Sequence, residues 1–284
     1  MVVISRITRS EDFRQFLKKL GIRGEIFVVK PDWMNASAFT SAETLDSLFS
    51  ALNGRIKVID GYSAWRNELN TGSRPKEVIT PNNAKAKWRW IKEQDAWFLR
   101  FSGIDQVLVR HDAEYINVTE EVWSGRTLEA DEVRDYVDSK FGVLVRQKMY
   151  GFVPTRIYEL KGSTLLSLSS SFRNRDQISL STKNLFSLIP NPARYAVHGT
   201  NERRSSQSIV DINKIYRSFF SPCYWINEIK ELGILVGSKN SLETDVVSAE
   251  LLGLDHEKIG YLRHATNVFG GYNKKVLENL PSAF

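Results

Sequence analysis

One stretch of this 284-residue chain, from Ser179 to Gly199, sets four side chains that can do chemistry among apolar residues. A lysine and an arginine bind anions, an amide orients a ligand, and a histidine carries protons near neutral pH. Burying such groups without partners costs several kcal/mol each, so their apolar surroundings indicate that the stretch lines a pocket. We predict Lys183, Asn184 and Arg194 as ligand-binding residues and His198 as a catalytic proton carrier. The alternative is a surface lysine and a hydrogen-bonded core histidine.

Charged residues also follow the first three predicted strands. Lys30, Asp60 and the pair His111 and Asp112 each come directly after one of them. Because the carboxyl ends of parallel strands meet at one edge of a sheet, where ligands bind, we expect these side chains to converge. Lys30 is then a further anion ligand, and Asp60 is the acid/base partner of His198. The alternative is that Lys30 and Asp60 simply pair with each other.

The elements that must position these residues begin with a βαβ unit. A β-branched run at 25–29 is followed by apolar residues at helical spacing over 45–52 and by a second strand at 55–59. Such a unit has a right-handed crossover. Thr40 and Glu43, three residues apart, predict a capping box at the start of its helix.

A third unit follows, with a helix predicted over 84–101 and a strand over 106–109. Strands that alternate with helices predict an α/β fold with a mainly parallel central sheet and helices on both faces. We expect a single domain over 1–284, and sub-lobes 1–140 and 141–284 are the alternative division.

The middle of the chain is less regular and contains β-structure. A long segment, 67–83, precedes it and is typical of a lid or binding loop. The polar run 203–208 predicts a loop. Further strands are expected at 143–145, 156–160, 165–168 and 234–236, and further helices over 209–219, 242–252 and 258–265.

Four motifs also follow one another in a distinctive order. They are Lys30-Pro31-Asp32, the strand and turn at 58–62, Lys183-Asn184-Leu185 with a later His198-Gly199, and the strand, aspartate and helix within 233–253. In this order they resemble the domain-of-unknown-function family 362, an uncharacterised α/β family. The resemblance implies an α/β fold and assigns no reaction.

The chain departs from that family's pattern at two places. Many members have a Lys-x-Lys-Thr-His run where this chain has 169–173, and some carry the cysteines of an iron–sulfur cluster where this chain has only Cys223. One cysteine cannot supply the usual four ligands, so no iron–sulfur cluster is expected. The sequence indicates no other particular cofactor.

Composition and charge restrict the class of protein. The chain is 42% hydrophobic and 25% charged, which is typical of a globular protein with a large core. A single cysteine excludes an intrachain disulfide and favours the cytoplasm, and no apolar window is long enough for a transmembrane helix. The net charge of +6 favours anionic partners in general.

Phosphate-binding motifs are weak in this chain. Neither a Gly-x-Gly-x-x-Gly fingerprint nor a P-loop occurs. The polar loop 237–241 is a weaker anion-binding candidate, because it precedes a helix whose first N–H groups are free to donate. Asp245 lies in the first turn of that helix, and we expect it to stabilise the dipole of its own helix.

The sequence predicts no metal site. The four histidines lack the spacing of metal ligands, and Asp60, Asp112 and Asp211 are too scattered to define an oxygen site. We therefore expect a cytoplasmic protein that binds a small phosphate- or carboxylate-bearing ligand in a cleft at the strand ends. It is either an acid/base enzyme or a non-catalytic regulatory protein.

Nucleic acid is the alternative partner. Lys85, Arg89 and Lys92 form a basic stripe on the helix predicted over 84–101, and tryptophans lie beside it. Such a helix can track phosphates while a ring stacks on a base. A solvated face of an ordinary amphipathic helix gives the same pattern.

Overall fold

A seven-stranded sheet forms the centre of the computed structural model, which describes residues 1–7, 9–33, 39–63, 86–171, 173–174, 177–197, 202–278 and 280. The strand order is β1-β9-β8-β5-β2-β3-β4, and a separate two-stranded sheet pairs β6 with β7. The strands are β1 (Val3–Arg6), β2 (Ile26–Pro31), β3 (Arg55–Asp60), β4 (Glu114–Asn117), β5 (Thr164–Ser171), β6 (Arg173–Asn174), β7 (Gln177–Ile178), β8 (Cys223–Ile229) and β9 (Ile234–Ser238).

The central part of the sheet is parallel. Strands β4, β3, β2, β5 and β8 run in one direction, and the antiparallel β9 and then β1 extend the edge beyond β8. This confirms the α/β class and the mainly parallel sheet. At its middle, β2 pairs with β5, so strands from both halves of the chain form one sheet.

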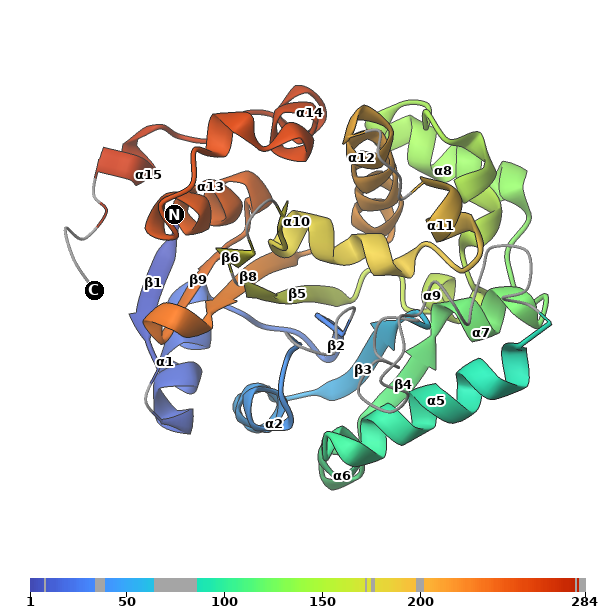
Figure 1. Ribbon diagram of the computed structural model, residues 1–284, viewed down its shortest axis with the longest axis horizontal. Helices are drawn as coiled ribbons and strands as arrows, with labels where there is room; N and C mark the ends of the chain where they lie inside the picture. Colours follow the sequence, from blue (N-terminus) through green and yellow to red (C-terminus); the bar gives the residue numbers. More distant parts are fainter. Residues whose placement is uncertain are drawn as a thin grey trace.

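Helices cover both faces of this sheet (Figure 1). Alternate residues of β2 show the division: Val28 belongs to the core on one face, and Phe27 and Val29 belong to the core on the other. This alternation follows from the two-residue period of a strand. The helices that contribute to the core around Phe27 are α1 (Ser10–Leu20), α2 (Ala42–Ala51), α5 (Trp88–Phe101) and α6 (Ile104–Arg110).

The face around Val28 is covered mainly by the second half of the chain. The core there draws on α8 (Ala130–Phe141), η2 (Gln147–Phe152), η3 (Leu185–Leu188), α12 (Glu202–Phe219), α13 (Ser241–Leu251) and α14 (Gly260–Phe269). The shorter elements are α7 (Val118–Trp123), α9 (Thr155–Glu159), α10 (Ser181–Asn184), α11 (Ala193–Val197), η4 (Lys230–Leu232), η5 (His256–Lys258) and α15 (Lys275–Glu278).

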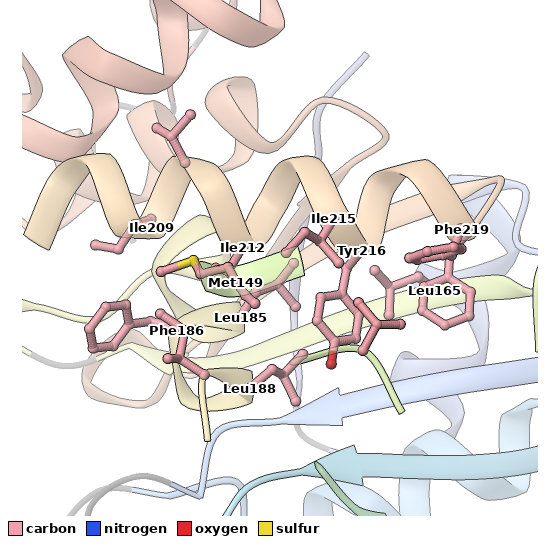
Figure 2. Packing of buried hydrophobic residues seen from close by; sticks show 14 of the residues in the cluster. Met149, Leu165, Leu185, Phe186, Leu188, Ile209, Ile212, Ile215, Tyr216 and Phe219 are labelled. Carbon is pink, nitrogen blue, oxygen red and sulfur yellow. The ribbon is translucent and has the colours of Figure 1, made fainter. Parts of the chain in front are cut away.

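Helix α12 anchors this second face. Ile212, Ile215 and Phe219 repeat at helical spacing and are each 1% exposed, which buries a continuous apolar stripe. Figure 2 shows this stripe against the residues of η3 and Leu165 of β5, and it shows the hydroxyl of Tyr216 directed away from its own helix. The helix predicted over 209–219 is therefore confirmed, and it begins earlier than expected.

Several predicted elements were wrong in type. The segment 106–109 is part of α6, whose buried Ile104, Val107 and Leu108 follow a helical period, and the third parallel strand is β4. The segment 156–160 lies mostly in α9, and 143–145 has no regular structure. The polar run 203–208 is not a loop, because it forms the first turns of α12.

Helix α2 confirms its prediction but begins one residue later than the capping box indicates. The N-cap is Ser41, whose hydroxyl accepts a hydrogen bond of 3.2 Å from the N–H of Thr44. Thr40 instead accepts a bond of 2.9 Å from the N–H of Asp32, so it fixes the exit from β2. Among the helices that the structure describes, none is long and apolar enough to cross a membrane.

Candidate functional site

Polar side chains lie between the sheet and the segment that contains α10 and η3. On the face around Val28, each strand becomes polar toward its carboxyl end, with Lys30 on β2, Ser167 and Ser169 on β5 and Asn227 on β8. The register places Lys30 beside Ser167 and places Ser169 beside Asn227. All four side chains are fully buried. Buried polar groups need hydrogen-bond partners, and the covering segment supplies many of them.

Lys30 and Asp60 form a buried ion pair across β2 and β3. The Lys30 Nζ and the Asp60 Oδ1 are 3.3 Å apart, and both side chains are 0% exposed. Lys30 also donates to the Asn184 Oδ1 at 3.0 Å and to the carbonyl of Pro31. The convergence of the two strand ends is as expected, and so is the alternative in which the two residues pair with each other.

The carboxylate of Asp60 also holds the covering segment in place. Its Oδ1 accepts hydrogen bonds from the N–H of Gly61 at 2.8 Å and from the Ser187 hydroxyl at 2.6 Å. A Cβ at Gly61 would lie 2.5 Å from the carbonyl oxygen of Ser187. Glycine is therefore required there because two backbone segments approach closely.

Asn184 pins α10 to the ends of β2 and β5. Its Nδ2 donates to the carbonyls of Lys30 at 2.9 Å and Leu168 at 3.2 Å, and to the Ser167 hydroxyl at 3.2 Å. Its Oδ1 receives the ammonium of Lys30. The structure thus gives Asn184 an orienting function directed at the lysine and the strand ends.

Lys183 lies next to Asn184 on α10. Its side chain is only partly exposed, and burial lowers the pKa of its ammonium, while the charge of Asp32 acts in the opposite direction. Asp32 follows β2 directly, and its Oδ2 accepts from the hydroxyls of Ser169 at 3.2 Å and Ser179 at 3.1 Å. Asn184, the neighbour of Lys183 on α10, contacts Lys30, so the two lysines lie on the same face of the sheet.

Arg194 closes the turn after η3. Its guanidinium is buried and donates to the carbonyl of Ser187 at 2.7 Å and to the carbonyl of Tyr62. Asn191 donates to the same Tyr62 carbonyl at 2.9 Å. These bonds tie the segment after β3 to the segment before α11. The neighbouring candidate, His198, lies outside the residues that the structure describes.

The pair His111 and Asp112 does not join this site. Both follow the helix α6 instead of a strand, and the His111 Nε2 lies 2.8 Å from the Asp46 Oδ1 on α2. Asp112 has a φ of 47°, which places it in a tight turn before β4. The expected convergence therefore fails for these two residues, because the third strand was assigned to the wrong segment.

Asp245 has a function that the sequence did not reveal. It is completely buried on α13, yet its carboxylate accepts from the N–H groups of Ser181 and Thr182, both at 3.0 Å, from the Ser181 hydroxyl at 2.6 Å and from Asn227 at 3.0 Å. It thus caps α10, the helix that carries Lys183, and Asn240 caps α13. The expectation that Asp245 stabilises its own helix was wrong. Burial raises the pKa of its carboxyl group.

Metal, nucleophile and nucleic-acid candidates have structural partners. Asp211 accepts the N–H groups of Val145 and Arg146 at 3.1 and 2.7 Å, and within the described ranges no three acidic, histidine or cysteine side chains gather as metal ligands. Burial raises the pKa of the Cys223 thiol to about 11.

On the basic stripe, Lys92 pairs with Glu120 at 2.9 Å and Arg89 with Glu93 at 3.1 Å, while Lys85 lies outside the described residues.

Comparisons with protein-family models, curated proteins and solved structures found no match to this chain.

Proposed function

We propose that this protein binds a small phosphate- or carboxylate-bearing ligand at the carboxyl ends of its parallel strands, with Lys183 as the principal cation. The observation that carries the proposal is the state of this lysine. Burial lowers the pKa of its ammonium group, and its side chain is nevertheless partly exposed. An anion beside such a group restores the stabilisation that burial removes.

The surrounding groups fit a ligand site built on rigid elements. Lys30, Asp60 and Asn184 hold one another by direct contacts, so they position the segment on which Lys183 lies. The negative charge of Asp32 acts on Lys183, so it would compete with an incoming anion for the lysine ammonium group. We further propose that the protein is a cytoplasmic member of the domain-of-unknown-function family 362, on the order of its motifs.

Isothermal titration with inorganic phosphate and citrate tests the proposal. Lys183→Gln should weaken binding by about tenfold or more, because a hydrogen bond to a charged group contributes about 1.5–3 kcal/mol. Asp32→Asn should strengthen it, because a competing negative charge is removed. The exposed Lys148 provides the matched control, and Lys148→Gln should bind as the unchanged protein does.

The pH dependence has a defined sign. Only the protonated ammonium attracts an anion, and its pKa lies below the usual 10.5. Affinity should therefore fall as pH rises through this lowered pKa, and Lys183→Gln should abolish that part of the profile. Equal affinity of the Lys183→Gln variant and the unchanged protein at neutral pH would contradict the proposal.

A catalytic function for His198 and Asp60 is a second part of the proposal. If the bound ligand is turned over, His198→Gln should lower kcat by about a hundredfold while affinity changes little. A protein that binds phosphate or citrate normally, with no reaction of any phosphorylated or carboxylated substrate tested, would instead be a binding protein.

A further inference from the structure

A cavity lies on the face of the sheet opposite to Lys30 and Lys183. It has a volume of about 370 Å³ and is bounded by the N-terminal turns of α1 and α2 and by the end of the β8–β9 hairpin. Phe13, Ile234 and Leu235 supply apolar surface, and Ser10 and Ser47 are among the hydroxyl groups that line it. This volume is within the range of sites for small molecules.

Glu228 of β8 brings a fixed carboxylate to this cavity. Its Oε1 accepts from the Thr44 hydroxyl at 2.8 Å, and its Oε2 accepts from the Ser170 hydroxyl at 3.2 Å. Two elements, α2 and β5, thus hold the side chain in one position. Each carboxylate oxygen has two lone pairs, so each oxygen can still accept a hydrogen bond from a ligand.

The described part of the chain supplies no counter-charge to this carboxylate. Among the residues that the structure describes, no lysine, arginine or histidine lies within ion-pair distance of Glu228. Thr44 and Ser170 donate neutral hydrogen bonds only. A ligand ammonium would therefore meet a positioned negative charge that has hydrogen-bond capacity left.

Cationic side chains stand elsewhere on the lining. Arg9 is 78% exposed, with its guanidinium 3.8 Å from Asp12, and Lys230 donates to the carbonyl of Phe39 at 2.8 Å. These groups can receive an anionic group of a ligand whose cation lies against Glu228. The lining therefore offers three kinds of contact: an anion, a cation and an apolar surface.

We propose that this cavity binds the zwitterion of a small apolar amino acid. The ammonium group pairs with Glu228, the carboxylate faces Arg9, and the side chain packs on Phe13 and Leu235. A dicarboxylate would be repelled by Glu228. The ligand class thus differs from that proposed for the Lys183 site on the opposite face.

Titration calorimetry with L-leucine and two of its fragments tests the proposal. 3-Methylbutylamine lacks the carboxylate, and 4-methylpentanoate lacks the ammonium group. L-Leucine should bind most tightly, the amine more weakly, and the acid least. Glu228→Gln should weaken the binding of L-leucine by about tenfold or more, and Arg9→Gln should weaken it by a smaller factor. Arg9→Gln should leave the binding of 3-methylbutylamine unchanged.

Two further variants keep the result interpretable. Ser47→Phe adds bulk to the lining from α2 without removing a charged group, and it should also abolish L-leucine binding. Lys183→Gln should leave L-leucine binding unchanged. The result for L-leucine therefore does not depend on whether Lys183 binds an anion. Thermal unfolding confirms that each variant folds. Absence of L-leucine binding to the unchanged protein, or equal affinity of Glu228→Gln, would overturn the proposal.

Discussion

Lys30 and Asp60 lie at the ends of two neighbouring parallel strands and form an ion pair, with the Lys30 Nζ 3.3 Å from the Asp60 Oδ1. Both side chains are completely buried. Removing two charges from water is costly, and attraction compensates only when hydrogen bonds satisfy the remaining groups. Here Asn184, Ser187 and the N–H of Gly61 provide those bonds. The pair therefore depends on the segment that covers it.

A double-mutant cycle measures this dependence. Lys30→Met and Asp60→Leu should each lower the free energy of unfolding by about 3–5 kcal/mol, because each leaves a buried charge without its partner. The double variant should lose clearly less than the sum of the two. Urea unfolding monitored by tryptophan fluorescence gives these values. Strict additivity would show that the two charges do not interact.

Asp245 predicts a pH-dependent contribution to stability. Burial raises the pKa of its carboxyl group above 3.8, so the folded state keeps a proton that the unfolded state has already lost. Its contribution is therefore fully present below about pH 4 and decreases as pH rises through the raised value. The difference in unfolding free energy between the unchanged protein and Asp245→Asn should shrink over that interval. A difference independent of pH would contradict this assignment.

Cys223 should be a poor nucleophile. The thiolate is the reactive form, and burial raises the pKa of this thiol to about 11, while its Sγ lies 3.3 Å from the carbonyl oxygen of Phe220. At pH 8, iodoacetamide should modify the folded protein at least about tenfold more slowly than the urea-unfolded protein. Mass spectrometry of the two time courses checks this. Equal rates would show that the thiol is accessible and ionises normally.

The basic residues of α5 should contribute little to either stability or binding. Lys92 is 62% exposed in its pair with Glu120, and Arg89 is 95% exposed in its pair with Glu93, so each pair contributes at most about 1 kcal/mol. Changing both to glutamine should leave binding to single-stranded RNA unchanged in gel-shift titrations. A loss of affinity with a smaller salt dependence would favour nucleic acid as the partner.

The sequence predicted the elements whose apolar spacing is regular. Helix α2 and the flanking β2 and β3 were recognised because Leu45, Leu48 and Phe49 repeat on one face. Strand β8 was missed because Asn227 and Glu228 interrupt its apolar pattern, although Asn227 is fully buried. Its burial is possible because the carboxylate of Asp245 accepts its amide hydrogen.

Only the part of the candidate site that lies at the strand ends could be predicted from the sequence. Lys30 and Asp60 converge because parallel strands share an edge, which can be inferred from order alone. The function of Asp245 could not be inferred, because it caps Ser181, 64 residues away, after packing of α13 on α10. No local pattern encodes such a contact.

The placement of β1 at the edge of the sheet has a consequence for the order of folding. Val3 pairs with Gly237, so the first strand of the sheet is held by the last. Contacts between residues so far apart in the sequence form late, because closing the long loop between them loses entropy before the pairing can compensate. During synthesis, β2 and β3 can assemble early as a local unit, whereas β1 must wait until β9 (Ile234–Ser238) has been made. Until then its edge is open to other chains.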